Sequence, residues 1–255
     1  MLNYKDTGTG FPVLLIHGLF GNLDNLAGLG RALLDAHFRV IQVDVRNHGE
    51  SPTYASMSYD DMAQDIVSLL DHLNIAECHL VGHSMGGKIA MRVALRQPQR
   101  IKALGVADIA PVPYQSHHVN VLKGLDELER KPTASRKEAD TLLAEFIAEA
   151  GVRQFLLKNL RWTNGRAEWR LRYPEVKQEY DAIIGWNRID AQFCQPTLFI
   201  KGNDSDYITA EYREEIAKYF PTSKAKIIQG TGHWLHAEKP EAFNRIVLQF
   251  LTGVG

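Results

Sequence analysis

The residues GHSMG at positions 82–86 place a serine between two glycines, after an apolar run and before a helix-like segment. A nucleophile raised on a sharp strand-to-helix turn needs small residues two positions before and after it, because strand and helix approach closely there. Gly82 and Gly86 meet that need, so Ser84 is the candidate nucleophile. The alternative is a glycine-rich helix entrance with Ser84 as its N-cap. Phosphate binding is disfavoured, because the Gly-x-Gly-x-x-Gly spacing is absent.

Serine is a poor nucleophile unless a base removes its proton, and the chain offers ten histidines as bases. We select His233, because it follows the last predicted strand, where loops gather at the same edge of the sheet as the serine. His236 is the second candidate, with a place at a helix start as its alternative role. His83 is expected to point away from the serine, and the pair His117–His118 lacks the nearby carboxylates or cysteines of a metal site.

An attacked carbonyl also needs hydrogen-bond donors for its developing negative charge. The segment VLLIHGLFG at positions 13–21 is typical of a strand followed by a His-Gly loop. Such a loop aims the backbone N–H of Leu19 at the site beside that of Met85, and it makes His17 a candidate for contact with the substrate. A simple strand exit is the alternative interpretation.

These segments must meet at one edge of a sheet, and the apolar pattern predicts such a sheet. Six short apolar runs have strand length: 13–16, 40–43, 78–81, 104–107, 198–200 and 225–228. Helix-like stretches separate several of them, including one after Ser84 that Gln97-Pro98 ends and one that starts at Pro240. The alternation predicts an α/β fold with a mostly parallel, doubly wound sheet.

The alternation stops between residues 112 and 185, where no strand of the parallel type is found. Apolar spacing predicts an amphipathic helix over 139–147, Asn164-Gly165 predicts a tight turn, and Pro174–Ile184 predicts a helix that Gly185 ends. We therefore expect a core domain of residues 1–111 and 186–255, with a helical cap inserted at residues 112–185.

The 255 residues carry a formal charge of −1, and acidic and basic side chains are intermixed along the chain. This argues against nucleic acid and anionic membranes as partners and favours a small-molecule substrate, while it fixes no oligomeric state. Cys78 and Cys194 each lie beside an apolar run, far apart in sequence, so we expect reduced, buried thiols. With no apolar signal region and no run of ~18 apolar residues, we expect no membrane span and a cytoplasmic location.

Four motifs occur in the order typical of the α/β-hydrolase family: His17-Gly18, DVRNHGESP at 44–52, the Ser84 segment and Gly232-His233. The chain thus resembles this family over almost its full length. More closely, RNHG (46–49), GHSMGGK (82–88), DIAPV (108–112) and GHWLHAEKP (232–240) are similar to the YbfF-type bacterial esterases. The resemblance implies an α/β-hydrolase fold and hydrolysis of carboxylic esters, with acyl-CoA thioesters as a further substrate class.

The acid of a Ser-His-acid triad departs from the common family pattern. Most relatives have an aspartate three residues after the glycine that ends the penultimate strand, but Ser205 stands there. We select Asp108, which ends the strand next to the nucleophile turn and matches the acid position of the YbfF-type esterases. Ser205 would then donate a hydrogen bond to Asp108 and hold it. Asp204 and Asp206 are alternatives, because a one-residue shift of their loop brings either carboxylate to the histidine.

In this interpretation Ser84 attacks the ester carbonyl, His233 relays its proton, and Asp108 fixes the imidazole tautomer. Water then hydrolyses the acyl-enzyme, and the chemistry needs neither a metal nor an organic cofactor. Carbon–carbon bond hydrolysis on the same fold is one alternative. A non-catalytic ligand-binding role is the other.

Aromatic and basic residues at and near the cap are candidates for substrate binding. The aromatic side chains could wall an acyl pocket, although a cap core is the simpler interpretation. Six basic residues against one acid between 153 and 172 could steer the phosphates of an acyl-CoA, although a solvated face is the simpler interpretation. The candidates are Trp162, Trp169, Trp186, Arg166 and Arg170.

Overall fold

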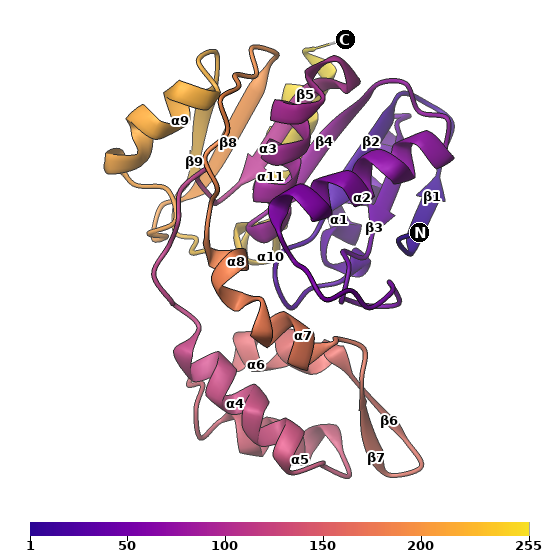
Figure 1. The fold of residues 1–255 in the computed structure, drawn as a ribbon, viewed down its shortest axis with the longest axis vertical. Helices are drawn as coiled ribbons and strands as arrows, with labels where there is room; N and C mark the ends of the chain where they lie inside the picture. The colour runs from indigo at the N-terminus through magenta and orange to yellow at the C-terminus, as the bar shows by residue number, and fades with distance from the viewer. Residues whose placement is uncertain (255) are drawn as a thin grey trace.

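The computed structural model describes residues 1–254, and a seven-stranded sheet forms its centre (Figure 1). The strands are β1 (Tyr4–Thr7), β2 (Pro12–Ile16), β3 (Arg39–Val43), β4 (Cys78–His83), β5 (Ile101–Ala107), β8 (Thr197–Gly202) and β9 (Lys224–Ile228). Their order is β1-β3-β2-β4-β5-β8-β9, and only β1 pairs antiparallel with its neighbour. All six predicted strands are present. The edge strand β1 escapes prediction, because its residues YKDT form no apolar run.

Helices cover both faces of this sheet. They are α1 (Ala27–Asp35), α2 (Tyr59–His72), α3 (Met85–Arg96), α9 (Arg213–Tyr219), α10 (Leu235–Glu238) and α11 (Pro240–Thr252), with short 3-10 turns η1 (Leu23–Leu26), η2 (Pro98–Arg100) and η4 (Ala210–Tyr212). On β2, Val13 and Leu15 pack in the cluster with α1 and α11, whereas Leu14 and Ile16 pack in the cluster with α2 and α3. Because both faces of the inner strands are buried, these strands read as mostly apolar runs, and the doubly wound prediction is confirmed.

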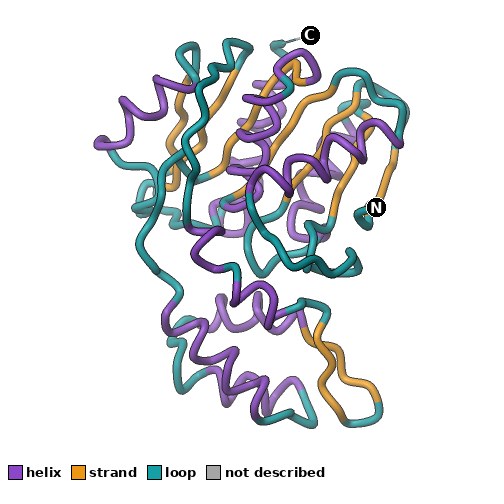
Figure 2. Tube along the Cα trace, viewed as in Figure 1, coloured by secondary structure: helices purple, strands orange, loops and turns teal. Residues whose placement is uncertain are grey.

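The segment between β5 and β8 forms a separate layer at one end of the core (Figure 1), and Figure 2 shows that it is mainly helical with one hairpin. Its elements are α4 (Val119–Arg130), α5 (Arg136–Leu143), α6 (Ala150–Leu156), η3 (Leu157–Asn159), β6 (Leu160–Thr163), β7 (Arg166–Trp169), α7 (Tyr173–Gln178) and α8 (Tyr180–Ile184). An inserted helical cap is therefore part of the fold.

Within the cap, the predicted tight turn is confirmed and two predicted helices differ in length. Asn164-Gly165 joins β6 to β7 with positive φ angles of 51° and 72°. The helix predicted over 139–147 ends at Leu143, and the last apolar residues of its pattern pack from the turns that follow. The helix predicted over Pro174–Ile184 is interrupted at Glu179, between α7 and α8. The Glu179 carboxylate accepts a hydrogen bond from the backbone N–H of Met57 in the core.

The two cysteines differ in exposure, so the prediction of two buried thiols is wrong for one of them. Cys78 is buried on β4, whereas Cys194 is exposed in the loop before β8. Its neighbour Phe193 takes the buried position in that loop. Both thiols are free, and in the described part of the chain no helix combines the length and the apolar character needed to cross a membrane.

Candidate active site

Ser84 lies on a strained turn at the centre of the sheet, between β4 and α3. Its backbone has φ 54° and ψ −121°, a conformation that non-glycine residues rarely adopt. A side chain at Gly82 would overlap the carbonyl of Gly86, and one at Gly86 would overlap the carbonyl of Ile16. The Ser84 hydroxyl makes no capping hydrogen bond to α3, so the structure does not support the N-cap alternative.

A histidine from the far end of the chain meets this hydroxyl. His233 follows β9 in the loop before α10, and its Nε2 lies 2.8 Å from the Ser84 Oγ. Its Nδ1 lies 2.8 Å from Oδ2 of Asp108, the residue directly after β5. With Nδ1–H donating to the carboxylate, Nε2 is left as the acceptor for the serine proton. His236 makes no such contact with Ser84, and burial lowers its pKa to about 4.

The carboxylate of Asp108 is fully buried and has three donors. Its Oδ1 accepts from the N–H of Gly202 at 3.0 Å, and its Oδ2 accepts from the Ser205 hydroxyl as well as from His233. Asp108 also has a positive φ of 52°. Neither alternative acid lies here: Asp204 and Asp206 are exposed, and no hydrogen bond joins either side chain to His233.

His83 makes no hydrogen bond to Ser84, but its side chain contacts the loop that carries His233. Its Nε2–H donates to the backbone carbonyl of His233 at 2.8 Å, and its ring lies between those of His233 and His236, with centroids 4.9 and 4.3 Å away. Burial lowers the pKa of His83 well below its usual value, so the ring stays neutral. The neighbour of Ser84 thus holds the loop that carries His233, a contact that strand alternation alone does not reveal.

Tyr207 is a second residue that sequence reasoning missed. Its ring stacks on the His233 imidazole at a centroid distance of 3.9 Å and an interplanar angle of 23°. The Tyr207 backbone carbonyl accepts a hydrogen bond from the Tyr114 hydroxyl at 2.5 Å, which fixes this loop against the segment after β5. An aromatic residue in the loop after β8, two positions beyond Ser205, is the signal that could have indicated it.

The loop after β2 is shaped by His17, whose ring is buried and serves the backbone. Its Nδ1–H donates to the Gly18 carbonyl at 2.8 Å, and its Nε2 accepts from the N–H of Val45 at 3.0 Å. Both ring nitrogens are therefore occupied by backbone groups, one after β2 and one after β3, and burial lowers the pKa of His17. Leu19 and Met85 both line a cavity beside Ser84, and the Leu19 N–H has no acceptor among residues 1–254.

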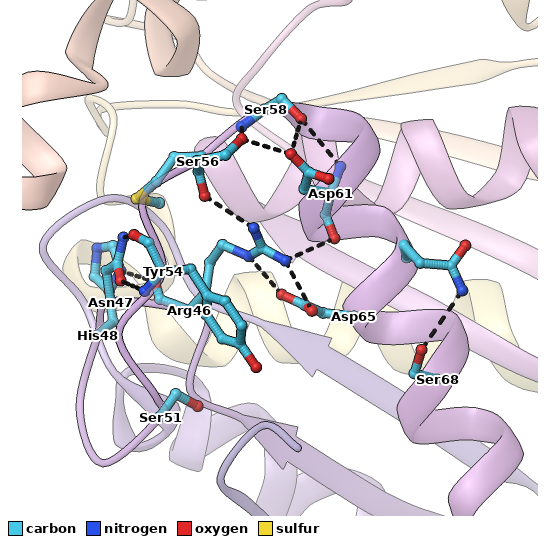
Figure 3. Close-up of polar contacts among 12 residues, drawn as sticks. Arg46, Asn47, His48, Ser51, Tyr54, Ser56, Ser58, Asp61, Asp65 and Ser68 are labelled. Carbon is cyan, nitrogen blue, oxygen red and sulfur yellow. Dashed lines mark hydrogen bonds and ion pairs between the residues drawn. The ribbon is translucent and has the colours of Figure 1, made fainter.

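His48, in the RNHG motif, braces the same loop from the other side. Its Nε2 accepts from the N–H of Phe20 at 3.2 Å, and its Nδ1–H donates to the Arg46 carbonyl. Burial, followed by the nearby His17, lowers the pKa of His48 to about 3. Figure 3 shows how Arg46 is held in turn, by two hydrogen bonds to Asp65 of α2 and one to the Ser56 carbonyl. The motif is therefore a support for the loop after β2.

Two cavities meet at Ser84, between the core and the cap. One has about 360 Å³ of empty space, part of it open to solvent, and includes Tyr59, Lys88 and Tyr114 in its wall. The other, of about 490 Å³, includes His233 and Phe155. Ser84, Leu19 and the cap residue His118 belong to both walls, so His118 stands where the two cavities join. Its Nδ1 lies 2.8 Å from the Tyr180 hydroxyl, and burial lowers its pKa to about 4.

The other residues predicted to bind substrate lie elsewhere. None of Trp162, Trp169, Trp186, Arg166 and Arg170 lines either cavity that contains Ser84. Trp169 stacks on Tyr173 of α7, and Trp186 packs against Tyr59 and Arg92. Arg170 and Arg161 both approach Glu50, at 3.4 and 2.6 Å. The clustering of aromatic residues and the excess of basic residues in the sequence do not indicate on which side of the cap these side chains lie.

The α/β-hydrolase fold family matches residues 12–240, which contain every group of this site. The chain belongs to the α/β-hydrolase family. Among curated proteins it is 41% identical to Esterase YbfF of Escherichia coli, over 94% of this chain and 93% of the relative. It is also 39% identical to the mouse sn-1-specific diacylglycerol lipase ABHD11, over 94% of this chain and 80% of the relative.

Among solved structures, one named a marine microorganism esterase superposes with a TM-score of 0.93 at 36% identity, covering 98% of both chains. The named relatives are esterases and a lipase, so the chain is an α/β-hydrolase of the esterase and lipase type. The predicted family and its esterase branch are confirmed, and the chain is classed as a carboxylic ester hydrolase.

Proposed function

We propose that this protein cleaves carboxylic esters through an acyl-enzyme on Ser84, with His233 as general base and Asp108 as the acid of the triad. The observation that carries the proposal is an unbroken line of hydrogen bonds, 2.8 Å from serine to imidazole and 2.8 Å from imidazole to carboxylate. Such a line activates the hydroxyl at neutral pH and later returns the proton to the leaving alcohol.

Two further groups serve this reaction in the proposal. The Ser205 hydroxyl and the Gly202 N–H donate hydrogen bonds to the carboxylate of Asp108 and keep it aimed at His233. The backbone N–H groups of Leu19 and Met85 form the oxyanion hole, and loss of one such donor costs about 3 kcal/mol of transition-state stabilisation.

We also propose that residues 112–185 act as a cap on a core of residues 1–111 and 186–255. In support, the cap supplies His118, Val121, Phe155 and Ile183 to the walls of the two cavities, while the core supplies Ser84. A cap in this place excludes water from the attacked carbonyl and shapes the groups on either side of the ester bond.

Oxygen esters are the better-supported substrates, and acyl-CoA thioesters have less support. Arg161 and Arg170 approach Glu50, which offsets their charge, and Arg166 lies outside both cavities. We therefore propose acyl-CoA thioesters only as substrates to be compared with oxygen esters in an assay. Carbon–carbon bond hydrolysis and a purely ligand-binding role have no contact in the structure that favours them.

Labelling by a fluorophosphonate probe tests the proposal directly. The wild-type protein should become labelled. Labelling should disappear in Ser84→Ala, which removes the hydroxyl, and in His233→Ala, which removes the base that activates it. Ser116→Ala, which removes a hydroxyl outside both cavities that contain Ser84, is the matched control and should label as the wild type does. A folded wild-type protein that stays unlabelled would favour the binding role instead.

A further inference from the structure

Lys88 is a buried cation in the cavity beside the nucleophile. It lies four residues after Ser84 on α3, and only 1% of its surface is exposed. Its Nζ donates to the backbone carbonyls of Ile184 at 3.0 Å and Gly185 at 2.7 Å, at the end of α8. Lys88 and Ser84 both line the cavity of about 360 Å³. The ammonium group has three N–H donors, so two carbonyls leave one donor for a further acceptor.

No anion balances this charge within residues 1–254. No carboxylate lies within ion-pair distance of Lys88, whose other neighbours are the rings of Tyr114 and Tyr59, at 4.8 and 5.5 Å. Burial alone lowers the pKa of Lys88 to about 7. Arg92, one turn further along α3, offers a contrast: it also holds a carbonyl of the returning chain, yet Asp60 pairs with it at 2.7 Å.

The position of His233 assigns this cavity to one half of the ester. In the proposed reaction His233 gives its proton to the leaving alcohol, so the alcohol must lie beside the imidazole. His233 lines the larger cavity and is absent from the wall that contains Lys88. The cavity with Lys88 is therefore the one that receives the acyl group.

We propose that Lys88 is a specificity-determining residue that selects acyl groups ending in a carboxylate, so that monoesters of short dicarboxylic acids are preferred substrates. The inference rests on the proposed esterase function. A substrate carboxylate supplies the missing anion and takes the remaining donor of the ammonium, whereas a purely apolar acyl group leaves the buried charge unbalanced. Lys88 lies one helical turn after Ser84, about 6 Å along the helix axis, so short dicarboxylic acids of about four to six carbons are the acyl groups to test.

The test compares matched pairs of esters. The monomethyl esters of succinic, glutaric and adipic acid are assayed by methanol release against methyl 4-methylpentanoate, 5-methylhexanoate and 6-methylheptanoate, in which an isopropyl group replaces the carboxylate. For the best pair, wild-type protein should show kcat/KM for the monoester at least equal to that for the neutral ester. In Lys88→Met, and in Lys88→Gln, which keeps a donor for the two carbonyls, the ratio should fall at least about 30-fold.

Arg92→Gln is the control, because it removes another cation of α3 that holds the returning chain but lines neither cavity; its ratio should stay at the wild-type value. A wild-type preference of more than about 100-fold for the neutral esters would overturn the inference without any variant, since burying an unpaired carboxylate costs at least about that factor. An unchanged ratio in folded Lys88→Gln would overturn it too. Absence of Ser84-dependent hydrolysis of every ester would instead refute the esterase proposal.

Discussion

The core edge and the cap face the same two cavities but are built differently. On the core side, the polar side chains are committed to one another or to backbone: His17 and His48 to the loop after β2, His83 to the loop of His233, and Ser205 to Asp108. On the cap side of the cavity with His233, apolar side chains predominate among the lining residues, such as Val121, Val152 and Phe155. The groups of the proposed reaction are therefore fixed by hydrogen bonds, whereas the apolar wall on the cap side is held by packing.

This difference predicts which kinetic constant a substitution in each region should change. A side chain that hydrogen bonds hold in one position can no longer take part in the reaction when that position is lost. Substitutions at the core edge should therefore lower kcat. A packed apolar wall adapts to a lost side chain, so changes in the cap should appear in KM and in substrate preference.

The largest effect is expected from Asp108→Asn. An amide at this position permits the wrong imidazole tautomer, so kcat should fall by a factor of ~10⁴ with KM little changed. Steady-state kinetics on a short p-nitrophenyl ester measures both constants. Asp204→Asn and Asp206→Asn are the matched controls and should be mild, because neither carboxylate contacts His233. The reverse ranking would identify a different acid.

A smaller effect, confined to binding, is expected from Phe155→Ala in the cap. Phe155 lines the cavity with His233 and lies 5.8 Å from the ring of Trp234. Loss of its apolar surface should cost about 1–2 kcal/mol of substrate binding, which raises KM for aryl esters roughly 5- to 30-fold while kcat stays within a factor of about two. Trp169→Phe, a cap aromatic outside both cavities, should leave KM unchanged. A fall in kcat as large as that of Asp108→Asn would erase the distinction between core edge and cap.

The smallest effect is expected on stability against pH at His48. The pKa of His48 is about 3 in the folded chain and near 6.5 when unfolded, so below pH 6.5 the unfolded state binds the extra proton. The contribution of the neutral ring is fully present above pH 6.5 and is lost as pH falls towards 3, at up to about 1.4 kcal/mol per pH unit.

His48→Gln should therefore make the unfolding free energy, measured by urea titration at pH 7, 6 and 5, fall less steeply than in the wild type. His37→Gln, on the exposed surface, is the control. If the unfolding free energy of His48→Gln and of the wild type changed equally with pH, His48 would bind protons equally in the folded and unfolded chain, which contradicts the prediction.

Much of the core was predictable from sequence because local patterns there coincide with tertiary requirements. Buried parallel strands are mostly apolar. Gly82 is dictated by the close approach of β4 and α3, and Gly86 by that of α3 and β2. The contacts of Ser84, His233, Asp108 and Ser205 follow once the strand order is known. The roles of these residues remain proposals that the variants above test.

The cap was less predictable, because local sequence patterns there do not specify the tertiary contacts. Its helices are short, and apolar spacing does not tell which aromatic ring faces the cavities and which faces the cap interior. Trp169 and Trp186 pack away from Ser84, while His118, which has no distinctive sequence context, stands where the two cavities join. His83 and Tyr207 escape prediction because their contacts bridge segments far apart in the chain.

The hydrogen bond from His83 to the carbonyl of His233 has a mechanical consequence. His83 is bonded in sequence to the nucleophile, so a displacement of the segment between β9 and α10 pulls on the same peptide that carries the serine. This hydrogen bond therefore opposes displacements that would increase the distance between the Ser84 Oγ and the His233 Nε2.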